Sequence, residues 1–167
     1  MFVGDETRAA VRAVAAAARL EGLASGGSLT QASYAAWREG AAVAGPAAGI
    51  PELVTVHSRG PVRRGAVSVL TLRWEVADAG GGLFPVLDAN VTLLPDGEQS
   101  TLIGLEGVYR TPQGTGLDPV TTRRAAAATI RSLLGRIADA ITDPAAHGGE
   151  RVSAGPGRAR GAVRSGA

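Results

Sequence analysis

The most regular pattern of hydrophobic and polar positions covers residues 118–143, DPVTTRRAAAATIRSLLGRIADAITD. Its apolar side chains are Ala126, Ala127, Ile130, Leu133, Leu134, Ile137 and Ile141. They recur every three or four residues, which is the spacing of one face of an α-helix. Asp118 can accept free backbone N–H groups of the first turn, Pro119 fits that turn, and Pro144 ends the helix. The pattern predicts one long helix whose single apolar face needs a partner surface.

Upstream of this helix, the apolar period shortens from nearly four residues to two. Alternation of this kind predicts β-strands with one buried face, at residues 53–58, 66–76, 86–94 and 99–110. Turn-forming residues separate them at positions 59–61, 78–82 and 95–97. The predicted dry face carries Leu70, Leu72, Trp74, Val76, Leu87, Ala89, Val91, Leu93, Thr101, Ile103, Leu105 and Tyr109. One-sided strands joined by short turns indicate an antiparallel sheet.

The N-terminal third of the chain carries weaker patterns. Residues 2–8 alternate in the manner of a short strand, and the Ala-rich composition of residues 9–23 favours a helix. Ser28 followed by Gln31 has the spacing of a capping box, which predicts a second helix over residues 29–40 with Trp37 buried. Glycines and prolines between residues 41 and 51 predict a loop.

Together these elements predict an α+β fold. An apolar sheet face and an apolar helix face bury each other, so Leu134 is expected at the centre of their contact. A chain of 167 residues suffices for one domain, which we assign to residues 1–143. Residues 144–167 are rich in Gly and Arg and lack apolar periodicity, which predicts a disordered tail.

Composition narrows the chemistry that the chain can perform. It contains no cysteine, which excludes disulfides and thiolate chemistry, and its two histidines are too few for a His-rich metal site. We therefore expect neither a metal nor a cofactor. No run of apolar residues is long enough to span a bilayer and no export signal is recognised. No membrane insertion is expected, and the sequence is interpreted as cytoplasmic.

Charge is distributed unevenly along the chain. All 17 basic residues are arginine, and residues 144–167 hold four of them with one Glu. The predicted domain therefore carries 13 Arg against 14 acidic residues. A nearly neutral domain is not the electrostatic surface that nucleic acid requires, so we expect no nucleic-acid partner. The sequence leaves the oligomeric state open.

A family resemblance rests on two stretches, residues 67–112 and 121–141. The motifs LRWE, GGLFPVLDA, GVYR and ATIR within them resemble an uncharacterised actinobacterial subgroup of the START-like superfamily, also labelled SRPBCC or polyketide cyclase-like. The resemblance implies a helix-grip fold, in which a curved antiparallel sheet wraps around a long C-terminal helix. It also implies a cavity between sheet and helix, since the superfamily includes apolar-ligand carriers, steroid-binding domains and aromatase/cyclases. The motifs identify a subgroup rather than a reaction.

Candidate ligand-binding residues are those expected to line this cavity: Leu72, Trp74, Leu93, Ile103, Leu105, Tyr109, Arg123, Ile130 and Leu134. Trp74 and Tyr109 offer an N–H and an O–H in an apolar wall, which suits a pocket that fixes one polar atom of an apolar ligand. Ordinary core packing predicts the same burial. Arg123 lies in the first turn of the long helix, where it either extends into solvent or meets an anionic group at the cavity mouth.

The catalytic candidates are weaker, and none is assigned. His57 is the only histidine of the predicted domain, but the sequence places no acid or nucleophile beside it. Glu75, Asp88 and Glu106 have the parity of the outer sheet face, where Arg73 and Arg110 can pair with them across strands. A solvated charge ladder is therefore expected rather than a catalytic pair.

The leading hypothesis is a non-enzymatic or weakly catalytic protein. It would bind a small hydrophobic molecule, such as a lipid, a sterol-like or a polyketide-like compound, in the cavity between the sheet and the C-terminal helix. One alternative is an aromatase/cyclase-type enzyme in which Tyr109 or Arg123 stabilises an enolate. Another is a partner-binding module that holds no ligand. The residues do not decide whether any reaction is catalysed.

Overall fold

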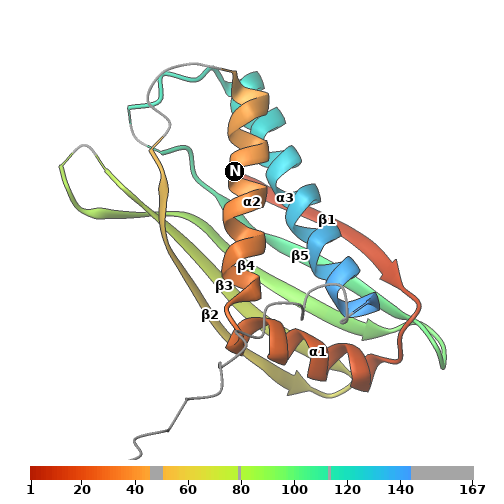
Figure 1. Cartoon of the computed structure of the whole chain (residues 1–167). Helices are drawn as coiled ribbons and strands as arrows, with labels where there is room; N and C mark the ends of the chain where they lie inside the picture. The colour runs from red at the N-terminus through yellow and green to blue at the C-terminus, as the bar shows by residue number, and fades with distance from the viewer. Residues whose placement is uncertain (46–50, 79, 113, 144–167) are drawn as a thin grey trace, which may run out of the picture.

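The computed structural model describes residues 1–45, 51–78, 80–112 and 114–143. In chain order its elements are β1 (Phe2–Ala9), α1 (Ala13–Ser25), α2 (Ser28–Ala44), β2 (Leu53–Arg64), β3 (Val67–Ala77), β4 (Leu83–Pro95), β5 (Thr101–Tyr109) and α3 (Pro119–Thr142). Figure 1 shows this α+β arrangement, which confirms the predicted order of elements. The predicted tail at residues 144–167 and residues 46–50 of the predicted loop lie outside the described residues.

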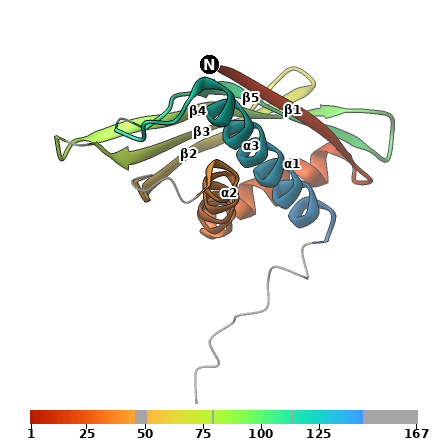
Figure 2. The same ribbon diagram turned by 90° about the horizontal axis from the view of Figure 1, so that it is seen from above.

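The strands form one antiparallel sheet in the order β1-β5-β4-β3-β2. The predicted dry face is confirmed, since Leu70, Leu72, Trp74 and Val76 of β3 are all fully buried. Figure 2 shows the three helices on that face of the sheet, while none of the described helices covers the other face. The sheet therefore has an inner face, which forms the core, and an outer face in contact with solvent.

Helix α3 confirms the longest predicted helix. Asp118 caps it by accepting hydrogen bonds from the backbone N–H groups of Val120 and Thr121, at 2.8 and 3.0 Å. Ile130 and Leu134 are buried on the side that packs against the sheet, although Ala127, expected on the same face, is exposed. The helix runs beside β1 in both views (Figure 1, Figure 2). A curved antiparallel sheet that packs around a long C-terminal helix is the helix-grip arrangement.

The two N-terminal helices differ from their predictions in detail. Helix α1 begins at Ala13 rather than near residue 9, because β1 continues to Ala9. Helix α2 begins one residue earlier than predicted and continues to Ala44. The capping box is wrong: Gly27, at φ 78°, is the capping residue, and no side chain caps the helix. Glycine adopts this left-handed conformation without steric cost, so backbone geometry starts α2.

The predicted turn at residues 59–61 is also wrong. Strand β2 continues through it to Arg64, and the register with β3 shifts between Arg59 and Val62. Proline within an edge strand is tolerated at such an irregularity, where its missing N–H costs no ladder hydrogen bond. The sequence signal of a turn therefore marks a β-bulge in a long edge strand.

Two glycines permit close contacts that shape the core. A Cβ atom on Gly107 of β5 would lie 2.6 Å from Ala89 of β4, so glycine allows the two strands to approach closely there. A Cβ atom on Gly40 of α2 would overlap the Thr129 hydroxyl of α3 and lie 2.9 Å from the Ala125 carbonyl oxygen. Helices α2 and α3 thus pack in close contact over the inner face, which α1 also contacts.

Candidate functional site

Eight of the nine candidate residues are buried in one apolar core. They are Leu72, Trp74, Leu93, Ile103, Leu105, Tyr109, Ile130 and Leu134. Arg123 is exposed on α3. We call the contact between the inner sheet face and helices α2 and α3 the seam. The structure brings the eight residues together in this seam, with α2 as an additional wall that the sequence did not assign to it.

The seam is not uniform along its length. Cross-strand pairing places Leu70, Val91 and Leu105 in one row and Leu93 opposite Ile103 in another. These large aliphatic side chains belong to the same buried cluster as Leu133 and Leu134. Of five hollows among the described residues, none is lined by these side chains. We call this part the closed end.

The other part, which we call the tyrosine end, has a different composition. Trp74, Leu87 and Tyr109 form one row across β3, β4 and β5. Two hollows meet there. The outer one, of about 360 Å³, is lined by Met1, Tyr109, Arg110, Thr111, Leu117, Pro119, Thr122 and Arg123. The inner one holds only about 10 Å³ and shares Tyr109, Thr111, Leu117 and Thr122 with the outer one. An open vestibule therefore leads to a nearly filled inner space.

The tyrosine end contains a buried polar atom without a partner. Trp74 is fully buried, and its indole Nε1 has no hydrogen-bond partner among the described residues. Its ring meets that of Trp37 from α2 edge to face, with centroids 6.4 Å apart and an interplanar angle of 85°. Trp37 in turn lines the inner hollow. Buried tryptophan N–H groups usually find an acceptor, and an unpaired one costs about 1–3 kcal/mol.

Tyr109 supplies a second polar group at the same place. The residue is buried, and burial raises the pKa of its hydroxyl to about 12. The hydroxyl is therefore protonated at any physiological pH and can donate a hydrogen bond. Strand parity predicted Tyr109 on the inner face of the sheet, and the residue is buried there.

The sequence did not identify the threonines of this site. Thr111 and Thr122 both line the two hollows. Thr111 follows β5, and Thr122 is buried in the first turns of α3. Thr122 and Thr129 are seven residues apart and both buried, so they extend the buried face of α3 towards its N-terminus at heptad spacing. That spacing was the available signal, and counting only aliphatic residues missed it.

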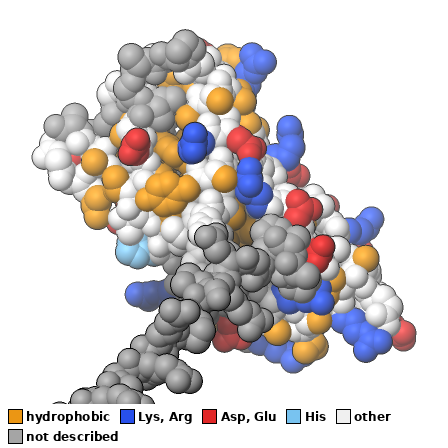
Figure 3. All heavy atoms as spheres, in the orientation of Figure 1, with side chains coloured by type: hydrophobic (Ala, Val, Ile, Leu, Met, Phe, Trp, Pro, Cys, Tyr) orange, Lys and Arg blue, Asp and Glu red, His pale blue; other side chains and the backbone are white. Residues whose placement is uncertain are grey.

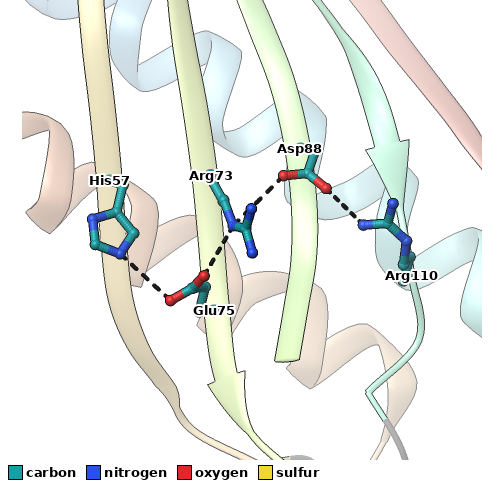
Figure 4. A network of polar contacts seen from close by, with 5 residues as sticks. All are labelled: His57, Arg73, Glu75, Asp88 and Arg110. Carbon is teal, nitrogen blue, oxygen red and sulfur yellow. Dashed lines mark hydrogen bonds and ion pairs between the residues drawn. The ribbon is translucent and has the colours of Figure 1, made fainter. Parts of the chain in front are cut away.

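The outer sheet face carries the predicted charge ladder. Arg73 Nε donates to Glu75 Oε1 at 2.9 Å, and Arg110 donates to Asp88 Oδ2 at 2.6 Å, while Glu106 is exposed. The ladder also includes His57, whose Nε2 lies 3.4 Å from Glu75 Oε2, although the sequence placed no acid beside this histidine (Figure 4). His57 lines none of these five hollows. The expectation of a solvated ladder is wrong for Glu75, which is buried, whereas His57, Arg73, Asp88 and Arg110 are at least one-third exposed.

Three further findings concern the described part of the chain as a whole. It contains no group of three or more His, Asp or Glu side chains placed to hold a metal ion. None of its helices combines the length and the apolar character needed to cross a bilayer. On the helix-covered face in Figure 3, positive and negative side chains are interspersed rather than gathered by sign. A further hollow of about 260 Å³, lined by residues of α1, α2 and α3 such as Ala32 and Ile137, lies apart from the tyrosine end.

No protein family and no curated protein matches this sequence. Among solved structures, the chain is similar to the crystal structure of TTHA0849 from Thermus thermophilus, with 13% identity, a TM-score of 0.44, and coverage of 84% of this chain and 97% of that one. It is also similar to the Zhui aromatase/cyclase from Streptomyces sp. R1128, with 13% identity, a TM-score of 0.27, and coverage of 87% and 98%. Because both TM-scores are low, neither similarity contributes to the functional conclusion.

Proposed function

We propose that this protein binds a small, largely apolar molecule at the tyrosine end of the seam, between the sheet and helices α2 and α3. The observation that carries the proposal is the buried indole N–H of Trp74, which has no acceptor among the described residues. A ligand carbonyl or hydroxyl oxygen that accepts this hydrogen bond would remove an unfavourable contribution of about 1–3 kcal/mol. The Trp74 N–H would thus gain in the complex the hydrogen bond that it lacks in the free protein.

The ligand would enter from the vestibule of about 360 Å³ and widen the inner hollow. Tyr109 and Thr122 line both spaces, so their hydroxyl groups can fix the polar end of the molecule. Its apolar part would contact apolar side chains that line these hollows, such as Trp37, Leu117 and Ala125. The candidate residues of the closed end, among them Leu93 and Ile103, would keep their packing and not reach the ligand. Arg123 at the vestibule would pair with an anionic group of the ligand. Affinity would come mainly from apolar burial, at about 25 cal/mol per Å² before the cost of association.

Two fluorescent probes test this proposal. Replacing Trp37 by Phe leaves Trp74 as the only tryptophan, since the chain has two. We expect the neutral dye N-phenyl-1-naphthylamine and the anionic dye 1-anilinonaphthalene-8-sulfonate both to quench Trp74 emission, and oleate, cholesterol or an anthraquinone to displace them. Thermal melts in parallel ensure that the dyes report a folded protein. Saturation without any change in Trp74 emission would refute the proposal.

The charge of the second dye separates the role of Arg123 from general apolar binding. Arg123→Ala should weaken the anionic dye about tenfold and leave the neutral dye unchanged, because an arginine–anion hydrogen bond contributes about 1.5–3 kcal/mol. Arg124→Ala is the matched control, since its side chain is also exposed on α3. Equal weakening of both dyes by Arg123→Ala would indicate loss of structure rather than loss of an anion contact.

An aromatase/cyclase reaction remains the second candidate, and the observation that favours it is the position of Tyr109 in the lining of both hollows. A neutral hydroxyl can donate a hydrogen bond to a developing enolate. This candidate requires turnover of a poly-β-ketone substrate that falls strongly in Tyr109→Phe while dye binding is retained. We further propose, on the order of elements and the motifs quoted above, that the chain is a START-like protein of the actinobacterial subgroup.

A further inference from the structure

Strand β1 forms one edge of the sheet, and its free side can be assigned residue by residue. Met1 and Tyr109 exchange both backbone hydrogen bonds, at 2.7 Å from Met1 N to Tyr109 O and 2.9 Å from Tyr109 N to Met1 O. Hydrogen-bonded pairs alternate with open pairs along an antiparallel ladder. The residues of β1 that direct their N–H and C=O groups away from β5 are therefore Phe2, Gly4, Glu6 and Arg8.

The two edges of the sheet are protected differently. Edge strand β2 contains Pro61 and a register shift between Arg59 and Val62, both of which discourage the addition of another strand. Edge strand β1 pairs with β5 over eight residues without a shift and contains no proline. Of the two edges, only β1 is regular enough to pair with a further strand.

A groove runs along this free edge, between β1 and α3. It has a volume of about 340 Å³ and is lined by Met1, Phe2, Val3, Gly4, Asp5, Arg123, Ala127, Ile130 and Arg131. Arg123, Ala127 and Arg131 follow one another at intervals of four residues and are all exposed, which explains why Ala127 is not part of the core. Figure 2 shows β1 and α3 side by side along the groove. The groove therefore has a backbone edge on one side and a row of helix residues on the other.

The charges of the groove are not balanced. Arg131 lies 3.9 Å from Asp5, but Arg123 has no ion-pair partner among the described residues. The Asp5 carboxylate also accepts a hydrogen bond of 2.9 Å from the N–H of Glu6, one of the donors on the free side of β1. The carboxylate thus occupies the position that a carbonyl oxygen of an added strand would take. When displaced, it can move fully to Arg131.

We propose that an extended segment of a partner protein adds to β1 as a further antiparallel strand, with an acidic side chain on Arg123 and an apolar side chain on Ala127 and Ile130. Four residues of helix rise about 6 Å, and alternate residues of a strand, which share a face, lie about 7 Å apart. The acidic and apolar residues are therefore two positions apart. Because α3 and β1 run in the same direction, the apolar residue precedes the acidic one in the antiparallel segment. Main-chain hydrogen bonds supply the affinity, and the pair of side chains supplies the specificity.

A second copy of the chain is a poorer occupant than a foreign segment. Antiparallel pairing of β1 with itself, centred on the strand, places either Asp5 opposite Asp5 or Glu6 opposite Glu6 of the other copy. Like charges directly opposite each other destabilise a sheet. A partner segment with a single carboxylate near Arg123 avoids this repulsion.

Selection from a random library of ten-residue peptides on the immobilised full chain tests the proposal. We expect enrichment of Asp or Glu two positions after an apolar residue, and a selected peptide should then bind in fluorescence polarisation. Glu6→Pro removes an N–H of the free edge at a position where proline is tolerated, and it should abolish binding. Arg123→Ala should remove the roughly tenfold preference for Glu over Gln in the peptide, whereas Arg124→Ala should not.

Each other outcome overturns the proposal. These outcomes are a library that yields no enriched spacing, or a peptide that binds Glu6→Pro as tightly as the natural sequence while both show the same melting temperature. A concentration-dependent dimer in sedimentation that Glu6→Pro abolishes would show that a second copy occupies the edge. Arg123 lines both the groove and the vestibule, so Glu6→Pro is the variant that separates this proposal from the ligand site, because Glu6 lines neither hollow of the tyrosine end. Dye binding should therefore be the same in Glu6→Pro.

Discussion

The closed end and the tyrosine end of the seam belong to the same sheet and the same helix, yet they are filled differently. At the closed end, aliphatic rows such as Leu93 opposite Ile103 are buried against α3 without a polar atom that needs a partner. At the tyrosine end, Trp74 and Tyr109 bring an indole N–H and a hydroxyl into the core. Tyr109 and Trp37, whose ring contacts that of Trp74, line a hollow there. The comparison suggests that one end maintains the fold and the other is available for a ligand.

The largest effect should come from the closed end. Leu134 is 3% exposed, and Leu134→Ala should lower the free energy of unfolding by about 2–5 kcal/mol, because a cavity is left in close packing. Leu134→Asp should leave no folded protein, since a charge would be buried without a partner. Chemical denaturation followed by circular dichroism measures both. A normal melting transition for Leu134→Asp would show that the closed end does not hold the fold together.

The second largest effect on stability should come from the contact between α2 and α3. Gly40→Ala forces a methyl group onto Thr129 and the Ala125 carbonyl oxygen, and overpacking of this kind costs about 1–3 kcal/mol. Gly135→Ala on α3 is the matched control, because its new methyl group would have no atom within 4 Å apart from its chain neighbours and the nearby backbone of its own helix. Alanine there should stabilise the helix by up to about 1 kcal/mol. Equal melting temperatures for the two variants would contradict the close contact of α2 and α3.

The tyrosine end should contribute a pH dependence that the closed end lacks. The pKa of Tyr109 is raised from 10.0 to about 12 in the folded protein, so between these values the folded state holds a proton that the unfolded state has lost. The stability that this proton provides is fully present below pH 10 and is lost as the pH rises towards 12, on the order of 2 kcal/mol in total. Urea titrations at several pH values measure the loss.

The same titrations on two variants assign that pH dependence. Tyr109→Phe has no hydroxyl to ionise, so its stability should fall less steeply between pH 10 and 12. Tyr34→Phe removes the hydroxyl of the other tyrosine, which is exposed on α2, and should leave the slope as it is. An unchanged slope in Tyr109→Phe would mean that its hydroxyl is not held in the core.

The smallest effect should come from the outer face, which provides a reference for both ends. Asp88 pairs with Arg110 at 2.6 Å and lies 3.8 Å from Arg73, with its side chain 39% exposed. Exposed ion pairs contribute about 0–1 kcal/mol, so Asp88→Asn should change the unfolding free energy by no more than that. The effect should shrink further in high salt. A loss of unfolding free energy as large as that of Leu134→Ala would show that the ladder contributes as much to stability as the core does.

The sequence by itself was sufficient for the fold class and for the inner face of the sheet. Strand parity placed Leu72 and Trp74 correctly, and the period of α3 placed Ile130 and Leu134 correctly, because burial of one face imposes a repeat that is written locally in the chain. Asp118 was identified as a cap for the same reason, since a cap acts on its own helix. Predictions from side-chain type were wrong where backbone conformation sets the structure. Gly27 rather than a Ser28 side chain begins α2, and the predicted turn at residues 59–61 is a bulge in β2.

Only the tertiary structure shows which residues from distant segments of the chain lie together in one site. Trp37 and Trp74 are far apart in the chain and meet only because α2 covers β3. Glu75 reaches His57 only through the register of β2 and β3, and the groove beside β1 requires α3 to run along an edge strand. Periodicity specifies which side of an element is buried but not which other element buries it. That choice depends on contacts between distant segments, whose energies are summed over the whole core.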